Sequence, residues 1–160
     1  MQGLLASMAP IHFGACTFDA GLVVFDKDGT LIDFAHAWGA KTVEWIEALA
    51  ALVSEREAIP HERIPTMRAD LYFAWGYDPV AHRFAPQGPM VTASLATLQI
   101  IAATVLYRHG LGWLDAEQLA RNAQVGMTSY ELTTEMFKTL ADLPQLFGTL
   151  RAAGVAIAVV

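Results

Sequence analysis

The residues best suited to chemistry stand together in the segment Asp26-Lys27-Asp28-Gly29-Thr30. Residues two apart on an extended chain point to the same side, so we expect the Asp26 and Asp28 carboxyls to lie side by side. Two neighbouring carboxyls can divide their work, one as nucleophile or metal ligand and the other as general acid. Gly29 lets the backbone turn sharply, and Thr30 offers a hydroxyl and an N–H at the same point.

The plainer interpretation of this segment is an Asp-Gly turn with solvated carboxylates. An Asp-Gly pair alone favours that interpretation. The longer pattern of Asp26, Asp28, Gly29 and Thr30 at fixed spacing, directly after an apolar run, is much more specific. We therefore treat the segment as a candidate active site.

The elements that must position this segment begin with Leu22-Val23-Val24-Phe25, a continuous apolar run. Such a run predicts a strand buried on both faces, as in a parallel sheet, and ligands bind at the carboxyl ends of such strands. A second run, Val155 to Val160, predicts another strand. A helix capped by Asp142, with Pro144 in its first turn, is predicted to precede it.

Between these parts, residues 35 to 140 follow helical spacing. Stripes of apolar residues predict helices around Trp38 to Val53, Ile64 to Ala74 and Leu95 to Val105. Asp115 is predicted to cap a helix, and Thr128 with Glu131 has capping-box spacing ahead of a helix that runs to Leu140. Residues 1 to 20 contain Gly3, Pro10 and Gly14, and we expect them to form a poorly defined leader.

Composition narrows the class of protein. The chain has 160 residues, of which 54% are hydrophobic and 16% charged, so disorder is excluded. A net charge of −6 argues against nucleic acid and anionic membranes as partners. The longest uncharged stretch, Phe84 to Tyr107, is interrupted by prolines and polar residues, so no membrane span is expected. The single cysteine, Cys16, excludes an internal disulfide framework and fits a cytoplasmic location.

The segment from Leu22 to Asp33 resembles the first motif of the haloacid dehalogenase superfamily of hydrolases. The helical region is similar in position and size to the inserted cap of the phosphoglycolate-phosphatase-like branch. Residues 146 to 160 resemble the run that leads into that family's second motif. The resemblance implies an α/β fold, with a Rossmann-like parallel-sheet core over 21–34 and 141–160, only its first two strands being present, and an all-helical cap over 35–140.

The resemblance also implies a function, that of a Mg²⁺-dependent phosphatase acting on small phosphorylated metabolites. Asp26 would attack phosphorus to form an aspartyl-phosphate, and Asp28 would protonate the leaving group and then activate water. The Asp26 carboxylate and the Asp28 backbone carbonyl would hold Mg²⁺. Gly29, Thr30 and His36 would contact the substrate, although His36 reads equally well as a surface residue.

Asp28 separates the chain from two related groups. Dehalogenases of the superfamily lack an acid at this position, and P-type ATPases have Thr there. A phosphomutase of the same superfamily stays open as an alternative. The family's second, third and fourth motifs are not found, so the chain resembles the N-terminal part of a larger hydrolase and is expected to be nearly inactive alone. A third possibility is a non-catalytic fragment that binds a partner, or associates with itself through unpaired strands.

Overall fold

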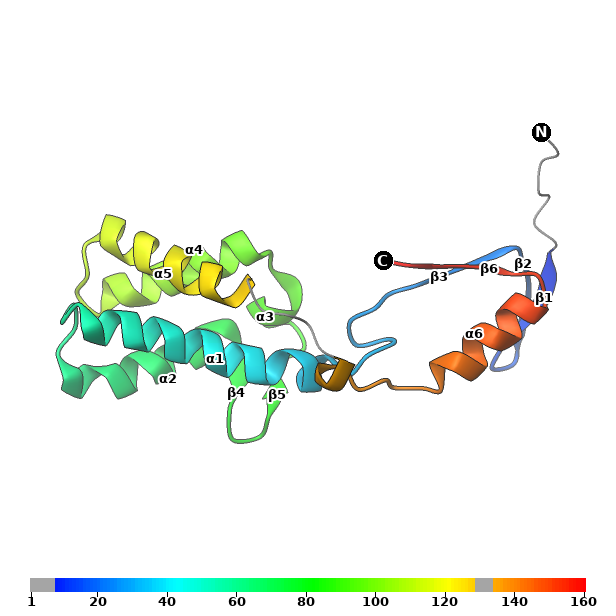
Figure 1. The fold of residues 1–160 in the computed structure, drawn as a ribbon, viewed down its shortest axis with the longest axis horizontal. Helices are drawn as coiled ribbons and strands as arrows, with labels where there is room; N and C mark the ends of the chain where they lie inside the picture. The colour runs from blue at the N-terminus through cyan, green and yellow to red at the C-terminus, as the bar shows by residue number, and fades with distance from the viewer. Residues whose placement is uncertain (1–7, 129–133) are drawn as a thin grey trace. The chain divides into compact units, whose positions relative to one another are not determined.

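The computed structural model describes residues 8–128 and 134–160 of the chain and has a mixed α/β architecture (Figure 1). It divides into two compact units. One contains the residues up to Phe34 and those from Phe137 onward, and we call it the sheet unit. The other, Ala35–Met136, is the helical unit.

The sheet unit contains two pairs of strands and a helix. β1 (Ala9–Phe13) pairs antiparallel with β2 (Cys16–Ala20), and β3 (Leu22–Phe25) pairs parallel with β6 (Ala156–Val159). α6 (Leu143–Ala152) precedes β6, as expected for a parallel connection. Both predicted strands and their parallel pairing are confirmed.

The two faces of the β3–β6 pair differ. Phe25 packs its ring 5.7 Å from that of Phe147 on α6, and Val23 on the same face is partly buried. On the other face Leu22 and Val24 are 53% and 52% exposed. The sequence predicts a strand buried on both faces, and in the described residues only one face is covered.

Residues 9 to 20 differ from the expected undefined leader, because they form the β1–β2 hairpin. Gly14, read from the sequence as a breaker, has φ +58° at the turn, a conformation that glycine adopts easily. Pro10 faces Asp19 in the pair and is tolerated because this two-stranded sheet consists of edge strands. The same residues that interrupt a helix are therefore compatible with a hairpin. Residues 1 to 7 of the expected leader lie outside the described part.

The helical unit runs through α1, α2, α4 and α5, with short elements between them. The bounds are α1 (Phe34–Glu55), η1 (His61–Arg63), α2 (Ile64–Trp75), β4 (Tyr77–Asp78), β5 (Arg83–Phe84), α3 (Pro89–Thr92), α4 (Leu95–Arg108), α5 (Trp113–Thr128) and η2 (Thr134–Met136). The predicted stripes thus coincide with α1, α2 and α4.

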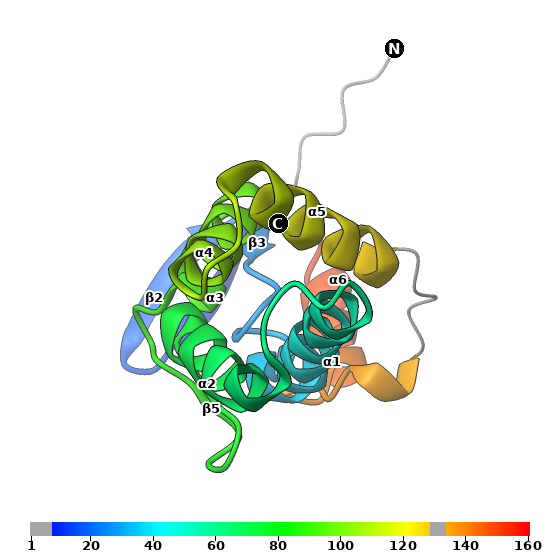
Figure 2. The same cartoon turned by 90° about the vertical axis from the view of Figure 1, so that its left-hand side faces the viewer.

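The helices α1, α2, α4 and α5 are grouped together in the end-on view (Figure 2). One apolar core of buried side chains holds them together. The rings of Trp45 on α1 and Trp75 on α2 are in contact, with centroids 4.5 Å apart and planes tilted by 45°. The Trp75 indole N–H donates to the Leu98 carbonyl of α4 at 3.2 Å. Leu71 and Leu106 are completely buried. The apolar residues that share one face of each helix therefore pack together into one continuous core.

The insertion is not all-helical. α2 ends at Gly76, whose φ of +75° allows its N–H to cap the Phe73 carbonyl, and the short antiparallel pair β4–β5 follows. This pair was too short to show a strand pattern in the sequence. Because the turn at Asp78 is closed by backbone N–H bonds to its carboxylate, two residues per strand suffice.

Two helix boundaries also differ from expectation. Asp115 lies inside the first turn of α5 rather than before it. The helix predicted to reach Leu140 is not present in residues 137–142, which are irregular and belong to the sheet unit. Of the predicted capping box, Glu131 lies outside the described residues. No helix in the described part of the chain is long and apolar enough to cross a membrane.

Candidate active site

The candidate site is the loop that leaves the carboxyl end of β3. The ladder extends past β3, because Val160 N–H donates to the Phe25 carbonyl at 2.9 Å and Lys27 N–H to the Val160 carbonyl at 3.1 Å. The Lys27 carbonyl then accepts from the N–H groups of Leu31 and Ile32 at 3.0 and 3.1 Å. Backbone hydrogen bonds therefore fix the loop at its start and its end.

A second segment of the sheet unit supports the far side of this loop. Asp33 N–H donates to the Lys138 carbonyl at 2.7 Å, and Leu140 N–H donates to the Leu31 carbonyl at 3.0 Å. Leu31 and Ile32 are buried at 6% and 8% exposure. The irregular residues 137–142 thus anchor the loop, a role that a helix reaching Leu140 would not have allowed.

The Asp26 carboxylate is held by the loop itself. The Thr30 hydroxyl donates to Asp26 Oδ2 at 3.0 Å, and both residues are exposed. The bond uses one carboxylate oxygen as acceptor and leaves the group at the surface, at the carboxyl end of a parallel strand. A carboxylate oriented by a neighbouring hydroxyl, and open to solvent, is suited to attack a substrate from outside.

The turn at Gly29 lets the Thr30 hydroxyl reach the Asp26 carboxylate. Its φ is +85°, in the left-handed region that favours glycine, and its N–H donates to the Ile32 carbonyl at 2.9 Å. A Cβ at this position would meet nothing closer than the Phe34 Cβ at 4.0 Å. The loop therefore requires glycine for its backbone conformation and not for space.

Asp28 has a partner that the sequence analysis did not assign. The Lys27 ammonium lies 3.1 Å from Asp28 Oδ2, and the two side chains are 48% and 32% exposed. An exposed pair of this kind contributes little to stability, so the carboxylate can exchange it for another partner. The adjacent opposite charges of Lys27 and Asp28 were the sequence signal for it.

The structure thus brings together part of the predicted set. Asp26 meets Thr30 through the turn at Gly29, and Asp28 meets Lys27 in the same loop. His36 is exposed in the first turn of α1 and belongs to the helical unit.

The loop offers only some of the donors that Mg²⁺ requires. Among the described residues, no group of three His, Cys, Asp or Glu side chains could hold a metal ion. The Asp26 carboxylate and the Asp28 backbone carbonyl are nevertheless hard oxygen donors. Mg²⁺ commonly binds one or two protein carboxylates and keeps several waters, so the loop fits part of such a site.

Described residues of the helical unit line a groove and a pocket outside this loop. A groove of about 560 Å³ runs between α1 and α2, and a pocket of about 490 Å³ lies beside the β4–β5 pair. The pocket has aromatic walls from Tyr72, Tyr77 and Phe84, with Arg83 at its edge. Burial raises the pKa of the Tyr77 hydroxyl, and the nearby Asp78 charge raises it further.

Comparison with protein-family models, with curated proteins and with solved structures gave no match. The geometry of the loop and the two cavities therefore carries the functional argument.

Proposed function

We propose that the loop at residues 26–30 is the nucleophile loop of a haloacid-dehalogenase-type phosphatase that acts on small phosphorylated metabolites. The observation that carries the proposal is the exposed Asp26 carboxylate directly after a parallel strand, oriented by the Thr30 hydroxyl at 3.0 Å. In this proposal the sheet unit is a Rossmann-like core and the helical unit its cap. The exposed single cysteine, Cys16, is consistent with a cytoplasmic location.

The reaction has two steps. In the first, an Asp26 carboxylate oxygen bonds to phosphorus, the bond from phosphorus to the ester oxygen breaks, and Asp28 gives that oxygen its proton. In the second, Asp28 takes a proton from water, the water oxygen bonds to phosphorus, and the aspartyl bond breaks. The products are the alcohol and inorganic phosphate, and both carboxyls return to their starting forms.

Lys27 and Thr30 have supporting roles in these steps. Asp28 must exchange Lys27 for a proton from solvent before it serves the leaving group, and the exchange is easy because the pair is exposed. Thr30 keeps one Asp26 oxygen occupied, so the other is directed at phosphorus. When bound at the Asp26 carboxylate and the Asp28 carbonyl, Mg²⁺ would supply charge neutralisation for the phosphoryl oxygens.

Acetyl phosphate tests the first step directly, since it transfers a phosphoryl group to carboxylates without needing a proton donor. The chain is incubated with acetyl phosphate and Mg²⁺, the acyl phosphate is trapped by borohydride reduction, and the modified residue is located by mass spectrometry. We expect modification at Asp26 and none in Asp26→Asn. Asp19→Asn, which removes an exposed carboxyl of β2, is the matched control and should behave as wild type. Modification at another carboxylate, or equal modification of wild type and Asp26→Asn, would contradict the proposal.

A phosphomutase shares the first step and differs in passing the phosphoryl group to a second sugar hydroxyl. Phosphorylated enzyme that has not been reduced distinguishes the two when it is offered a sugar monophosphate, because a mutase yields a bisphosphate and a phosphatase yields only inorganic phosphate.

A specific observation favours one non-catalytic function, which is self-association. Leu22 and Val24 on the uncovered face of β3 are more than half exposed, and the strands have unpaired edges among the described residues. Light scattering after size-exclusion chromatography measures the mass directly. A Leu22→Lys and Val24→Lys double variant should restore the monomer mass if this face is the contact.

A further inference from the structure

The groove between α1 and α2 is a built site that the proposed phosphatase chemistry does not use. Its lining is shared equally between the two sides: Glu47, Ala50, Ala51, Ser54, His61, Ile64, Pro65 and Arg68. A volume of about 560 Å³ is that of a small-molecule site. All of these residues lie within the helical unit.

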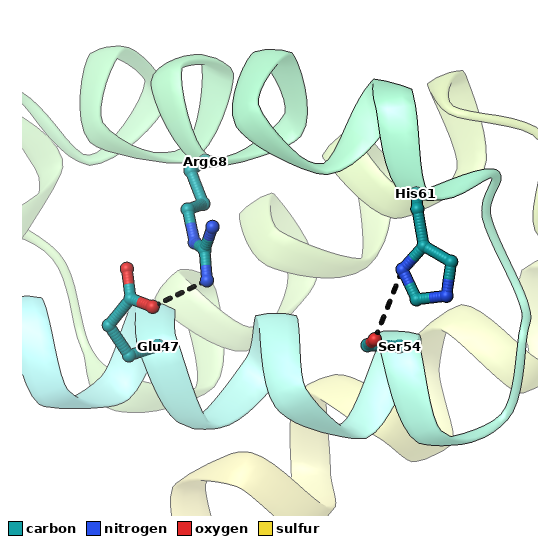
Figure 3. A network of polar contacts seen from close by, with 4 residues as sticks. All are labelled: Glu47, Ser54, His61 and Arg68. Carbon is teal, nitrogen blue, oxygen red and sulfur yellow. Dashed lines mark hydrogen bonds and ion pairs between the residues drawn. The ribbon is translucent and has the colours of Figure 1, made fainter.

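The polar lining residues form two pairs that cross the groove, Glu47 with Arg68 and Ser54 with His61, and we call these pairs the first and second rung. Glu47 and Ser54 are seven residues apart on α1, which is two helical turns, and His61 and Arg68 are seven apart on the facing segment. Glu47 meets Arg68 at one end and Ser54 meets His61 at the other (Figure 3). The floor between the rungs is apolar and made partly of small residues, which is why the groove is open.

The first rung presents both charges. Arg68 donates to Glu47 Oε2 at 2.6 Å, and the two side chains are 37% and 47% exposed. The guanidinium has further N–H donors, and its Nε is buried with no hydrogen-bond partner among the described residues. The buried Nε has no surface that a ligand could reach, so a ligand in the groove would bind the guanidinium N–H groups of the exposed part of the side chain.

The pair of charges selects the ligand class. A simple carboxylate bound to Arg68 would be repelled by Glu47, and a simple amine bound to Glu47 would be repelled by Arg68. A zwitterion places its carboxylate on Arg68 and its ammonium on Glu47, and both contacts are charge-assisted. The α-amino acid headgroup is the common molecule with this arrangement.

The second rung selects the far end of the ligand. Ser54 Oγ lies 3.4 Å from His61 Nδ1, and each residue can both donate and accept, depending on the imidazole tautomer. A carboxamide, which has a donor and an acceptor side by side, complements such a rung.

The length of the groove fixes the size of the ligand. Seven residues of helix span roughly 10.5 Å, and a hydrogen bond of about 2.9 Å at each end leaves about 5 Å for the ligand. A linear side chain of four heavy atoms spans this length. We propose that the groove binds a free α-amino acid with an amide-tipped side chain of this length, for which L-glutamine is the probe.

The test is a titration of the full chain labelled with ¹⁵N, followed by amide chemical shifts. L-Glutamine should shift amides of residues 47–68 in a saturable way, with Kd on the order of 1 mM or tighter. Glutaramate, which lacks the ammonium, and 4-aminobutanamide, which lacks the carboxylate, should each bind at least about 10-fold more weakly. This comparison needs no variant, so it does not depend on whether a variant folds.

Variants then assign the rungs. Arg68→Gln and Glu47→Gln should each weaken glutamine binding at least about 10-fold. Arg121→Gln, in an exposed position of α5 outside the groove, should leave it unchanged. Ser54→Ala should reduce glutamine affinity to that of L-norleucine, whose own affinity should not change. The proposal is overturned if glutamine causes no saturable shift, or if glutaramate or 4-aminobutanamide binds as tightly as glutamine. It is also overturned if Arg121→Gln weakens glutamine binding as much as Arg68→Gln does.

Discussion

The two units of this chain differ in how they bury their residues. In the helical unit, Leu71 of α2 and Leu106 of α4 are completely buried, and the indole of Trp75 is satisfied inside the core. In the sheet unit, Leu22 and Val24 of β3 are more than half exposed. Among its described residues, the buried apolar ones are few: Leu31 and Ile32 in the loop, Leu150 on α6 and Val155 between α6 and β6.

This difference indicates that the helical unit provides most of the stability and the sheet unit the candidate reactive groups. The helical unit has a core of its own, and its contacts hold helices that are near one another in sequence. The sheet unit contributes the candidate nucleophile but covers only one face of its parallel strands. Changes in the helical unit should therefore alter stability, and changes in the sheet unit should alter reaction rates.

Asp26→Asn should abolish formation of the aspartyl-phosphate, because an amide oxygen is a very weak nucleophile. The thermal melting curve should be nearly unchanged, since the Asp26 side chain is exposed and makes a single bond to Thr30. Acyl-phosphate trapping and circular dichroism measure the two effects. Residual trapping at wild-type level would remove Asp26 from the mechanism.

Asp28→Asn should slow transfer from an alkyl phosphate by about 10²–10⁴-fold, the usual contribution of general acid catalysis. Transfer from acetyl phosphate should change far less, because acetate leaves without a proton. The ratio of the two single-turnover rates is the measurement. Equal losses with both donors would show that Asp28 acts only through the loop structure.

Leu71→Ala should lower the free energy of unfolding of the helical unit by about 2–5 kcal/mol, because the side chain is fully buried and leaves a cavity. Leu22→Ala is the matched change in the sheet unit and should cost less than about 1 kcal/mol, because Leu22 is 53% exposed. Urea unfolding measures both losses. Tryptophan fluorescence reports the helical unit, which contains all four tryptophans, and far-ultraviolet circular dichroism reports the sheet unit. Similar losses in the two variants would mean that the faces of β3 are covered in solution.

Gly29→Ala should cost about 1–2 kcal/mol, because alanine at φ +85° is strained even where there is room for its Cβ. Gly148→Ala, in the middle of α6 where a Cβ also meets nothing, is the control and should stabilise by about 0.5–1 kcal/mol. Chemical unfolding should therefore show a lower free energy of unfolding for Gly29→Ala and a higher one for Gly148→Ala. Equal signs would show that strain is not what requires glycine in the loop.

The smallest effect concerns Asp78 in the turn between β4 and β5. Backbone N–H bonds from Ala81 and Val80 hold the pKa of its carboxyl below the usual value. A lowered folded-state pKa gives a contribution to stability that is present above the unfolded-state pKa and is lost as pH falls through the folded-state value. An NMR titration of the Asp78 carboxyl should give a midpoint below that of an unstructured aspartate. A midpoint at or above it would exclude the turn bonds in solution.

Much of the local structure could be predicted from the sequence. The run from Leu22 to Phe25 predicts β3, because a short, continuous apolar segment rich in β-formers favours a buried strand over a helix or a loop. Asp142 was correctly predicted as a helix cap, and its carboxylate accepts from the Gln145 N–H at 3.1 Å. The β1–β2 hairpin was missed because Gly14 and Pro10 were read as interruptions. The end of the helical region was misplaced because residues 137–142 make their contacts with a segment more than a hundred positions away.

The candidate sites also differ in how far they can be predicted from the sequence. The residues of the loop after β3 can be identified from the sequence, since Asp26, Gly29 and Thr30 are neighbours along the chain and a turn suffices to bring them together. That Glu47 faces Arg68 and Ser54 faces His61 follows from the folded structure alone. Helical periodicity fixes which residues share a face, but which faces meet depends on the packing of whole helices around Trp45 and Trp75.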